Sequence, residues 1–270
     1  MPFTPSHIAA ILPFARTRLV PAGLVAGSVA PDLFYYIPVR MPRDLSHSLL
    51  GVVTVDLAFG VVAVVLWQVI FRRPVVDFLP LWARARLASL PWTGLRAPRE
   101  TWVMTAVLLV ASIIVGTLTH LLWDTFTHPG WPVDAVPWLR AQAGPLLVHK
   151  WIQHASSVAG IVILVVWAVR WVRATAPSAP APTRLAVWSR ALAWIITVAA
   201  GLTGGLTVWI HGMLTGRPAL DPALVFITAR AGVAAACLAA VLIALIWWVL
   251  PTRVSPVVPE PRRVASEIAR

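Results

Sequence analysis

The chain has 270 residues, of which 59% are hydrophobic and only 12% are charged. Soluble domains usually carry about 25% charged residues, so this composition excludes an ordinary soluble domain and indicates a membrane protein. The formal net charge of +12 would suggest a nucleic-acid partner in a soluble protein. Here the arginines lie between apolar runs, so we attribute the charge to membrane topology and expect no nucleic-acid partner.

The first 48 residues contain two short apolar stretches, which we expect to form re-entrant or interfacial helices. Each stretch has about twelve residues, which is too few to cross a membrane independently. The two stretches would bring His7 and Asp32 toward the membrane surface. A sixth crossing by residues 8–37 is the alternative.

Five longer apolar runs follow, and a helix of about 20 residues is enough to cross a membrane. The expected spans are 49–71, 102–122, 155–172, 188–212 and 223–250. Arg72 and Arg73 are expected to end the first span, and residues 79–90 have the pattern of a helix on the membrane surface. The fold class is therefore all-α, a polytopic membrane helical bundle with about five transmembrane helices.

Proline and arginine divide the chain into four parts. Residues 1–172 form a motif-bearing membrane domain, 173–187 a proline-rich linker, 188–250 the last two spans, and 251–270 a basic tail expected to be disordered. Because arginine marks cytoplasmic loops, the linker and the C-terminus are predicted to be cytoplasmic. The arginines of the N-terminal region then lie outside, against that rule.

The motif on which the functional interpretation depends ends the second span, where His120, Asp124 and His128 follow one another at intervals of four. Each step of four advances ~40° around a helix, so the three side chains share one face. Two imidazoles and a carboxylate at a helix end suit a zinc or manganese ion. Because His120 and His128 would be ~12 Å apart on a straight helix, either His128 swings back or Asp124 bridges two ions. The competing interpretation is a polar helix end that binds loops and water.

The alternation of crossings gathers most of the histidines at one membrane face, which the loop arginines place outside. This face collects His7, Asp32, His47, His120, His128, His154 and His211, with His149 in the intervening loop. Random placement would scatter these residues, so their gathering indicates a metal or acid–base site. Asp56 and Arg230 lie ~10 Å inside the same face; we favour a structural pair between them, and a catalytic use is the alternative.

Five motifs occupy residues 1–7, 27–32, 46–48, 119–131 and 153–157. Together they resemble the DUF4184 family of bacterial membrane proteins, and the resemblance covers roughly 1–172. The pattern is similar, more loosely, to inner-membrane metal-dependent hydrolases of the YdjM type. That similarity implies metal roles for His7, Asp32, His47, His120 and Asp124. Leu33 and Phe34 stand where that group has a second acid, which leaves the number of metal ions open.

Together these patterns predict a multi-pass protein of the bacterial plasma membrane with a divalent-metal site at its extracytoplasmic face. We expect His120, Asp124 and His47 to bind the metal, with Asp32, His7 and His128 completing or bridging the site. Asp124 and His154 are the catalytic candidates, His154 as a proton shuttle. Tryptophans flanking the site suggest a membrane-lipid or phosphoester substrate for a metal-dependent hydrolase: Trp123, Trp131, Trp138 and Trp151. The alternatives are a transporter or metal-binding permease, and a non-catalytic scaffold whose histidines are structural.

Overall fold

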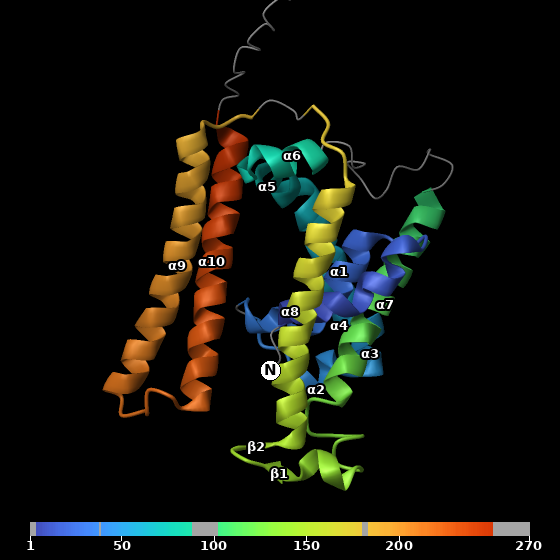
Figure 1. Ribbon diagram of the computed structural model, residues 1–270, viewed down its shortest axis with the longest axis vertical. Helices are drawn as coiled ribbons and strands as arrows, with labels where there is room; N and C mark the ends of the chain where they lie inside the picture. Colours follow the sequence, from blue (N-terminus) through green and yellow to red (C-terminus); the bar gives the residue numbers. More distant parts are fainter. Residues whose placement is uncertain (1–3, 38, 88–101, 180–182, 251–270) are drawn as a thin grey trace, which may run out of the picture.

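The computed structural model describes residues 4–37, 39–87, 102–179 and 183–250, and most of these residues are helical. Five of the helical segments are long and apolar enough to cross a membrane. They are Val55–Phe78, Trp102–Thr125, Val148–Ala174, Val187–Leu214 and Pro222–Val249. The predicted all-α membrane bundle is therefore confirmed (Figure 1).

The first span differs from the predicted 49–71 at both ends. Helix α3 (Leu49–Val53) is separated from α4 (Val55–Leu66) by Thr54, whose φ of −120° and ψ of −95° are not helical. The helix then continues through a π-helical turn, η3 (Trp67–Phe71), into α5 (Arg72–Phe78). The arginines do not end it because long side chains reach polar partners: Arg72 donates to Gln68 one turn back, at 3.1 Å.

Helix α10 (Pro222–Val249) supplies a hydrogen bond that this continuous span lacks. Pro74 has no N–H to donate to the carbonyl of Ile70, four residues earlier. The indole Nε1 of Trp248 donates to that carbonyl instead, at 3.0 Å. The same end of α10 is held by buried Asp77, whose Oδ2 accepts from Trp247 Nε1 at 2.7 Å. These two bonds attach the hairpin of α9 (Val187–Leu214) and α10 to the first span.

The N-terminal segment forms short helices inside the bundle. They are η1 (Thr4–Arg16), α1 (Pro21–Val29), η2 (Ala30–Tyr35) and α2 (Arg43–Ser46). Helix α1 is nine residues long, about 14 Å at 1.5 Å per residue, and cannot cross a membrane. It packs against α7 (Trp102–Thr125) and α4, while η1 packs against α8 (Val148–Ala174) (Figure 1). Among the described parts of residues 8–37 there is no helix long enough for a sixth crossing.

Two glycines let the backbones of α1 and α7 touch. A Cβ placed on Gly27 would lie 2.0 Å from the carbonyl oxygen of Ile113, and one on Gly116 would lie 2.2 Å from that of Leu24. No larger residue fits either position without moving a backbone. The close approach brings the end of α1 and the start of η2 beside the last turns of α7, where His120 and Asp124 lie.

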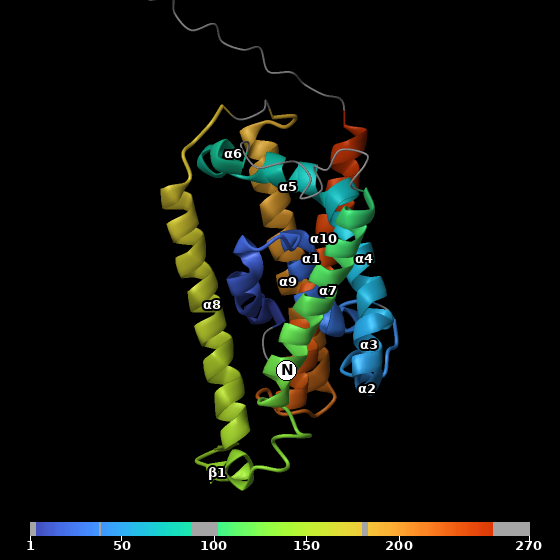
Figure 2. The ribbon, with the colours of Figure 1, turned by 90° about the vertical axis from the view of Figure 1, so that its right-hand side faces the viewer.

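The two ends of the bundle differ in character (Figure 2). At one end lie α5, α6 (Leu81–Leu87) and the linker, where Ser178 N–H donates to the carbonyl of Ala85 at 2.8 Å. At the other end are η5 (Pro137–Arg140) and a small hairpin of β1 (Gln142–Ala143) and β2 (Leu146–Leu147). Helix α6 covers part of the predicted surface helix, and residues 88–90 of that prediction lie outside the described residues, as does the 251–270 tail.

Candidate metal centre

Five side chains from four elements converge around the end of α7. His7 comes from η1, Asp32 from η2, His47 from the end of α2, and His120 and Asp124 from α7. They form two groups whose ligand atoms lie within 4.8 Å of one another: His7, His120 and Asp124, and Asp32, His47 and His120. His120 belongs to both groups. Either group has the nitrogen and oxygen donors that zinc or manganese accepts.

His120 is held in one orientation by the backbone of α1. Its Nδ1 donates to the carbonyl of Ser28 at 2.8 Å, which leaves Nε2 as the unprotonated nitrogen of the neutral ring. That Nε2 is buried, has no hydrogen-bond partner among the residues that the structure describes, and lies 3.8 Å from Asp32 Oδ2 and 3.9 Å from Asp124 Oδ2. A histidine whose second nitrogen binds a backbone carbonyl is the usual arrangement of a metal ligand.

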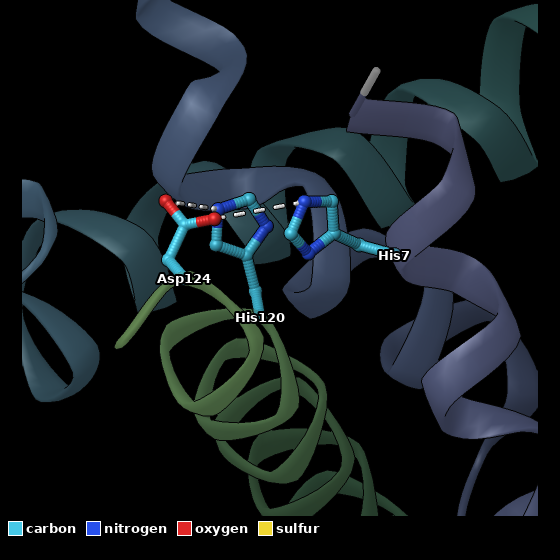
Figure 3. A group of neighbouring side chains, drawn as sticks. All are labelled: His7, His120 and Asp124. Carbon is cyan, nitrogen blue, oxygen red and sulfur yellow. Dashed lines mark ion pairs between the residues drawn. The ribbon is translucent and has the colours of Figure 1, made fainter. Parts of the chain in front are cut away.

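His7 lies flat against His120, with ring centroids 4.1 Å apart and planes 18° from parallel. Its Nε2 is 3.7 Å from Asp124 Oδ1 (Figure 3). Both of its ring nitrogens are buried, and neither has a hydrogen-bond partner within the described ranges. Burial, and after it the nearby His120, lower the pKa of His7 from 6.5 to about 3. The imidazole is therefore neutral at physiological pH, as a ligand must be. Buried polar atoms without partners are rare and call for an explanation, which a bound ion would supply.

His47 and Asp32 complete the opposite side of the cluster. His47 Nδ1 lies 2.9 Å from Ser46 Oγ, and its Nε2 lies 3.4 Å from Asp124 Oδ2 and 3.7 Å from Asp32 Oδ1. Asp32 Oδ2 accepts a 2.7 Å hydrogen bond from Thr4 Oγ1. Among the described residues, His47 Nε2 is the fourth histidine nitrogen of the cluster that is buried without a hydrogen-bond partner, after Nε2 of His120 and both ring nitrogens of His7.

Helix α7 ends at Thr125, so the separation expected between His120 and His128 on a straight helix does not hold. His128 lies beyond the helix and folds back toward Asp124. Its Nδ1 is 3.3 Å from Asp124 Oδ2, and its Nε2 is 3.4 Å from the side-chain amide of Gln153. The Gln153 Oε1 accepts from Lys150 Nζ at 2.9 Å, so its Nε2 faces His128 as a donor. His128 Nε2 is then an acceptor, and Nδ1–H lies within reach of both Asp124 Oδ2 and Thr127 Oγ1, the latter at 3.0 Å. This arrangement uses both ring nitrogens and holds the Asp124 carboxylate in place.

The predicted proton shuttle, His154, lies on α8 and is exposed. Within the described residues we find no hydrogen bond or ion pair that joins it to the cluster. The neighbouring Gln153 is buried and reaches the site through His128 instead. Sequence reasoning also missed Arg43, whose Nη2 donates to Asp124 Oδ2 at 3.0 Å. The spacing motif on α7 contains no signal for either residue, because both arrive from other elements.

The model of a protein family, the domain of unknown function DUF4184, matches residues 1–252. The chain belongs to the DUF4184 family. Its match extends through α9 and α10, beyond the roughly 1–172 that the motifs predicted. No curated protein matches the chain, and no solved structure does. The likeness to YdjM-type hydrolases therefore stays a resemblance between motifs.

A pocket of about 380 Å³ opens beside the cluster of this DUF4184 protein. Its polar end is formed by Arg43, His47, Asp124 and His128. Its other walls are Leu49, Leu118, Leu121, Leu122, Thr125, Pro129 and Trp131. Asp124 and His47 are thus the cluster residues that a molecule in the pocket can touch, while His7 and His120 are fully buried behind them.

The predicted pair of Asp56 and Arg230 does not form. Asp56 is fully buried at the start of α4, and neither of its carboxylate oxygens has a hydrogen-bond partner among the described residues. Arg230 is exposed on α10. The prediction was wrong because it used depth along the helices alone, and depth does not say which way a side chain points around the helix axis.

Proposed function

We propose that this membrane protein is a metal-dependent hydrolase whose divalent ion, zinc or manganese, is bound by His7, Asp32, His47, His120 and Asp124. The observation that carries the proposal is the set of three buried Nε2 atoms, on His7, His47 and His120, that face two carboxylates and have no hydrogen-bond partner in the described part of the chain. Unpaired imidazole nitrogens beside carboxylates fit an N/O-coordinated ion better than a structural core.

The residues around the ion have separate roles in this proposal. A divalent ion bound here would supply Lewis-acid activation of water and of the scissile group. Asp124 offers Oδ1, for which the described residues supply no hydrogen bond, while Arg43 and His128 hold Oδ2. We assign His128 to the orientation of Asp124 rather than to ligation, since both of its nitrogens are in use. His154 keeps the role of proton shuttle as a prediction, which the activity of His154→Ala tests.

The substrate class follows from the pocket. Its walls combine leucines of α7 with an arginine and the metal-binding side chains, so it suits a lipid-like phosphoester better than a polar metabolite. The arginine-rich end of the bundle, with α5 and α6, is opposite the end with the β1–β2 hairpin (Figure 2). We therefore propose that the site faces the extracytoplasmic side of a bacterial plasma membrane, in accordance with the rule for basic loops.

A metal-binding permease is the second candidate. The short helices η1 and α1 end inside the bundle and carry polar groups, a feature of transporters with broken helices. A permease would move the ion across sealed proteoliposomes, whereas a hydrolase would hold it. Retention of bound metal without uptake into the vesicle lumen supports the hydrolase.

The test of the proposed reaction uses detergent-purified protein with bis-p-nitrophenyl phosphate as a generic phosphodiester probe. We expect hydrolysis that a chelator abolishes, that zinc or manganese restores, and that Asp124→Asn lowers by at least tenfold. The matched control is Asp221→Asn, which lies on the distant α9–α10 hairpin and should leave hydrolysis unchanged. Hydrolysis that survives both the chelator and Asp124→Asn would contradict the proposal.

A further inference from the structure

We propose that Arg43 binds the phosphate head group of an amphiphilic substrate that enters the pocket sideways from the bilayer, with its alkyl chain along α7. This inference deepens the proposed function and rests on it for the reaction, although the binding step can be tested on its own. It assigns a substrate-binding residue and a direction of entry to the pocket beside the metal centre.

The position of Arg43 suits an anchor for an anion. It begins α2, and its side chain is 37% exposed in the wall of the pocket while Nη2 holds Asp124 at 3.0 Å. A guanidinium has five N–H donors in a planar fork; Arg43 uses one on Asp124 and also hydrogen-bonds to the Tyr35 side chain. The remaining donors can bind two oxygens of a phosphate at once, which a lysine cannot do with the same geometry.

The charges around the pocket favour such a cation. Asp124 lines the pocket, and Asp32 lies just behind His47. Their carboxylates repel an anionic group wherever a bound ion does not offset their charge. Among the described residues that line the pocket, Arg43 is the one permanent cation. An anionic head group is therefore held beside the metal-binding carboxylates most favourably alongside this side chain.

The apolar wall indicates that the rest of the substrate is a hydrocarbon chain. Leu118, Leu121, Leu122 and Thr125 follow helical spacing and form one stripe of α7. Leu118 is 41% exposed and Leu122 is 63% exposed, so the stripe continues from the pocket onto the surface of a transmembrane helix that faces lipid. A chain lying along this stripe never leaves an apolar environment, while its head group meets Arg43.

The inference is tested by the binding of dodecyl phosphate to the purified protein in phosphatidylcholine nanodiscs, measured by calorimetric titration. Inorganic phosphate supplies the head group without the chain. We expect dodecyl phosphate to bind more tightly than inorganic phosphate, and Arg43→Gln to weaken its binding by about tenfold or more, as is typical for the loss of a charged hydrogen bond. Arg43→Lys keeps the positive charge without the planar guanidinium, so its affinity for dodecyl phosphate should lie between those of the wild type and Arg43→Gln.

Two matched controls separate the site from general effects. Arg40→Gln removes the same charge from an exposed position three residues earlier and should leave binding unchanged. Leu118→Trp places a bulky side chain in the pocket at its apolar wall and should weaken the binding of dodecyl phosphate but not that of inorganic phosphate. Val110→Trp places the same side chain at another outward-facing position of α7 and should change neither.

Each outcome decides the inference. Absence of dodecyl phosphate binding to the wild type, equal binding to wild type, Arg43→Gln and Arg43→Lys, or equal effects of Leu118→Trp on both ligands would overturn it. Metal content measured in the same samples separates the two proposals. Wild-type protein that binds dodecyl phosphate through Arg43 but holds no metal would contradict the proposed hydrolase and leave the binding role of Arg43 in place. Protein that holds metal but binds dodecyl phosphate equally well whichever residue stands at position 43 would contradict the role of Arg43 alone.

Discussion

His7 and His120 stack face to face at 4.1 Å, although one comes from the first described helix and the other from the second transmembrane span. Burial, and after it the nearby His120, lower the pKa of His7 to about 3, so the His7 ring is neutral at physiological pH. The stacked pair lies next to two carboxylates, those of Asp124 and Asp32. Such an arrangement could hold a metal ion.

The lowered pKa of His7 predicts a pH dependence of stability in metal-free protein. The pKa of His7 in the folded state is about 3, below the ordinary 6.5, so between these pH values the unfolded chain binds a proton at His7 that the folded chain does not bind. The contribution of His7 to the free energy of unfolding is therefore fully present above pH 6.5 and is lost progressively as the pH falls toward 3. Thermal melts after chelation should show this loss, and His7→Gln should flatten it, whereas His211→Gln at an exposed position should not. Identical pH profiles for His7→Gln and the wild type would contradict the assignment of a buried neutral imidazole.

Asp124→Asn separates the metal-binding interpretation from the scaffold interpretation. Asparagine keeps the shape and removes the negative charge that a divalent ion needs, so metal content should fall by an order of magnitude or more. The metal-free protein should change in stability by only about 1 kcal/mol, because the ion pair with Arg43 is partly exposed. Elemental analysis and melts of the same preparations measure both quantities. Full metal content in Asp124→Asn would favour a structural role for the cluster.

The contact between α1 and α7 should control the site from a distance. Gly116→Ala places a methyl group against the Leu24 carbonyl and must push the helices apart. We expect a loss of roughly 1–3 kcal/mol, as for other overpacked interiors, together with weaker metal binding, because Ser28 moves away from His120. Gly205→Ala in α9 is the control, since its Cβ would lie 3.3 Å from the nearest atom. Equal effects of the two substitutions would show that the close approach is unimportant.

Asp56 is expected to lower the stability of the folded protein. A buried carboxylate without partners lowers stability, and asparagine keeps its shape without its charge. Asp56→Asn is therefore expected to raise the melting temperature of the metal-free protein. A substantial decrease would show instead that the carboxylate has a partner in solution, such as a cation.

Hydropathy and helical spacing predicted the five spans, and the interval of four placed His120 beside Asp124 on α7. Those features are local, so the sequence carries them directly. The break at Thr54 and the continuation past Arg72 depend on single backbone angles and on side-chain partners, which hydropathy does not record. Arg43 and Gln153 reach Asp124 and His128 only because distant segments pack together, and no periodic pattern marks either residue.

The metal content of purified protein tests the central claim most directly. Wild type, His120→Ala and His211→Ala would be purified in the same detergent without chelator and analysed for transition metals. We predict that the wild type and His211→Ala retain zinc or manganese, while His120→Ala loses at least nine-tenths of it, because His120 belongs to both ligand groups. Metal-free wild type that also fails to take up either ion, or undiminished metal in His120→Ala, would contradict a metal centre at the end of α7.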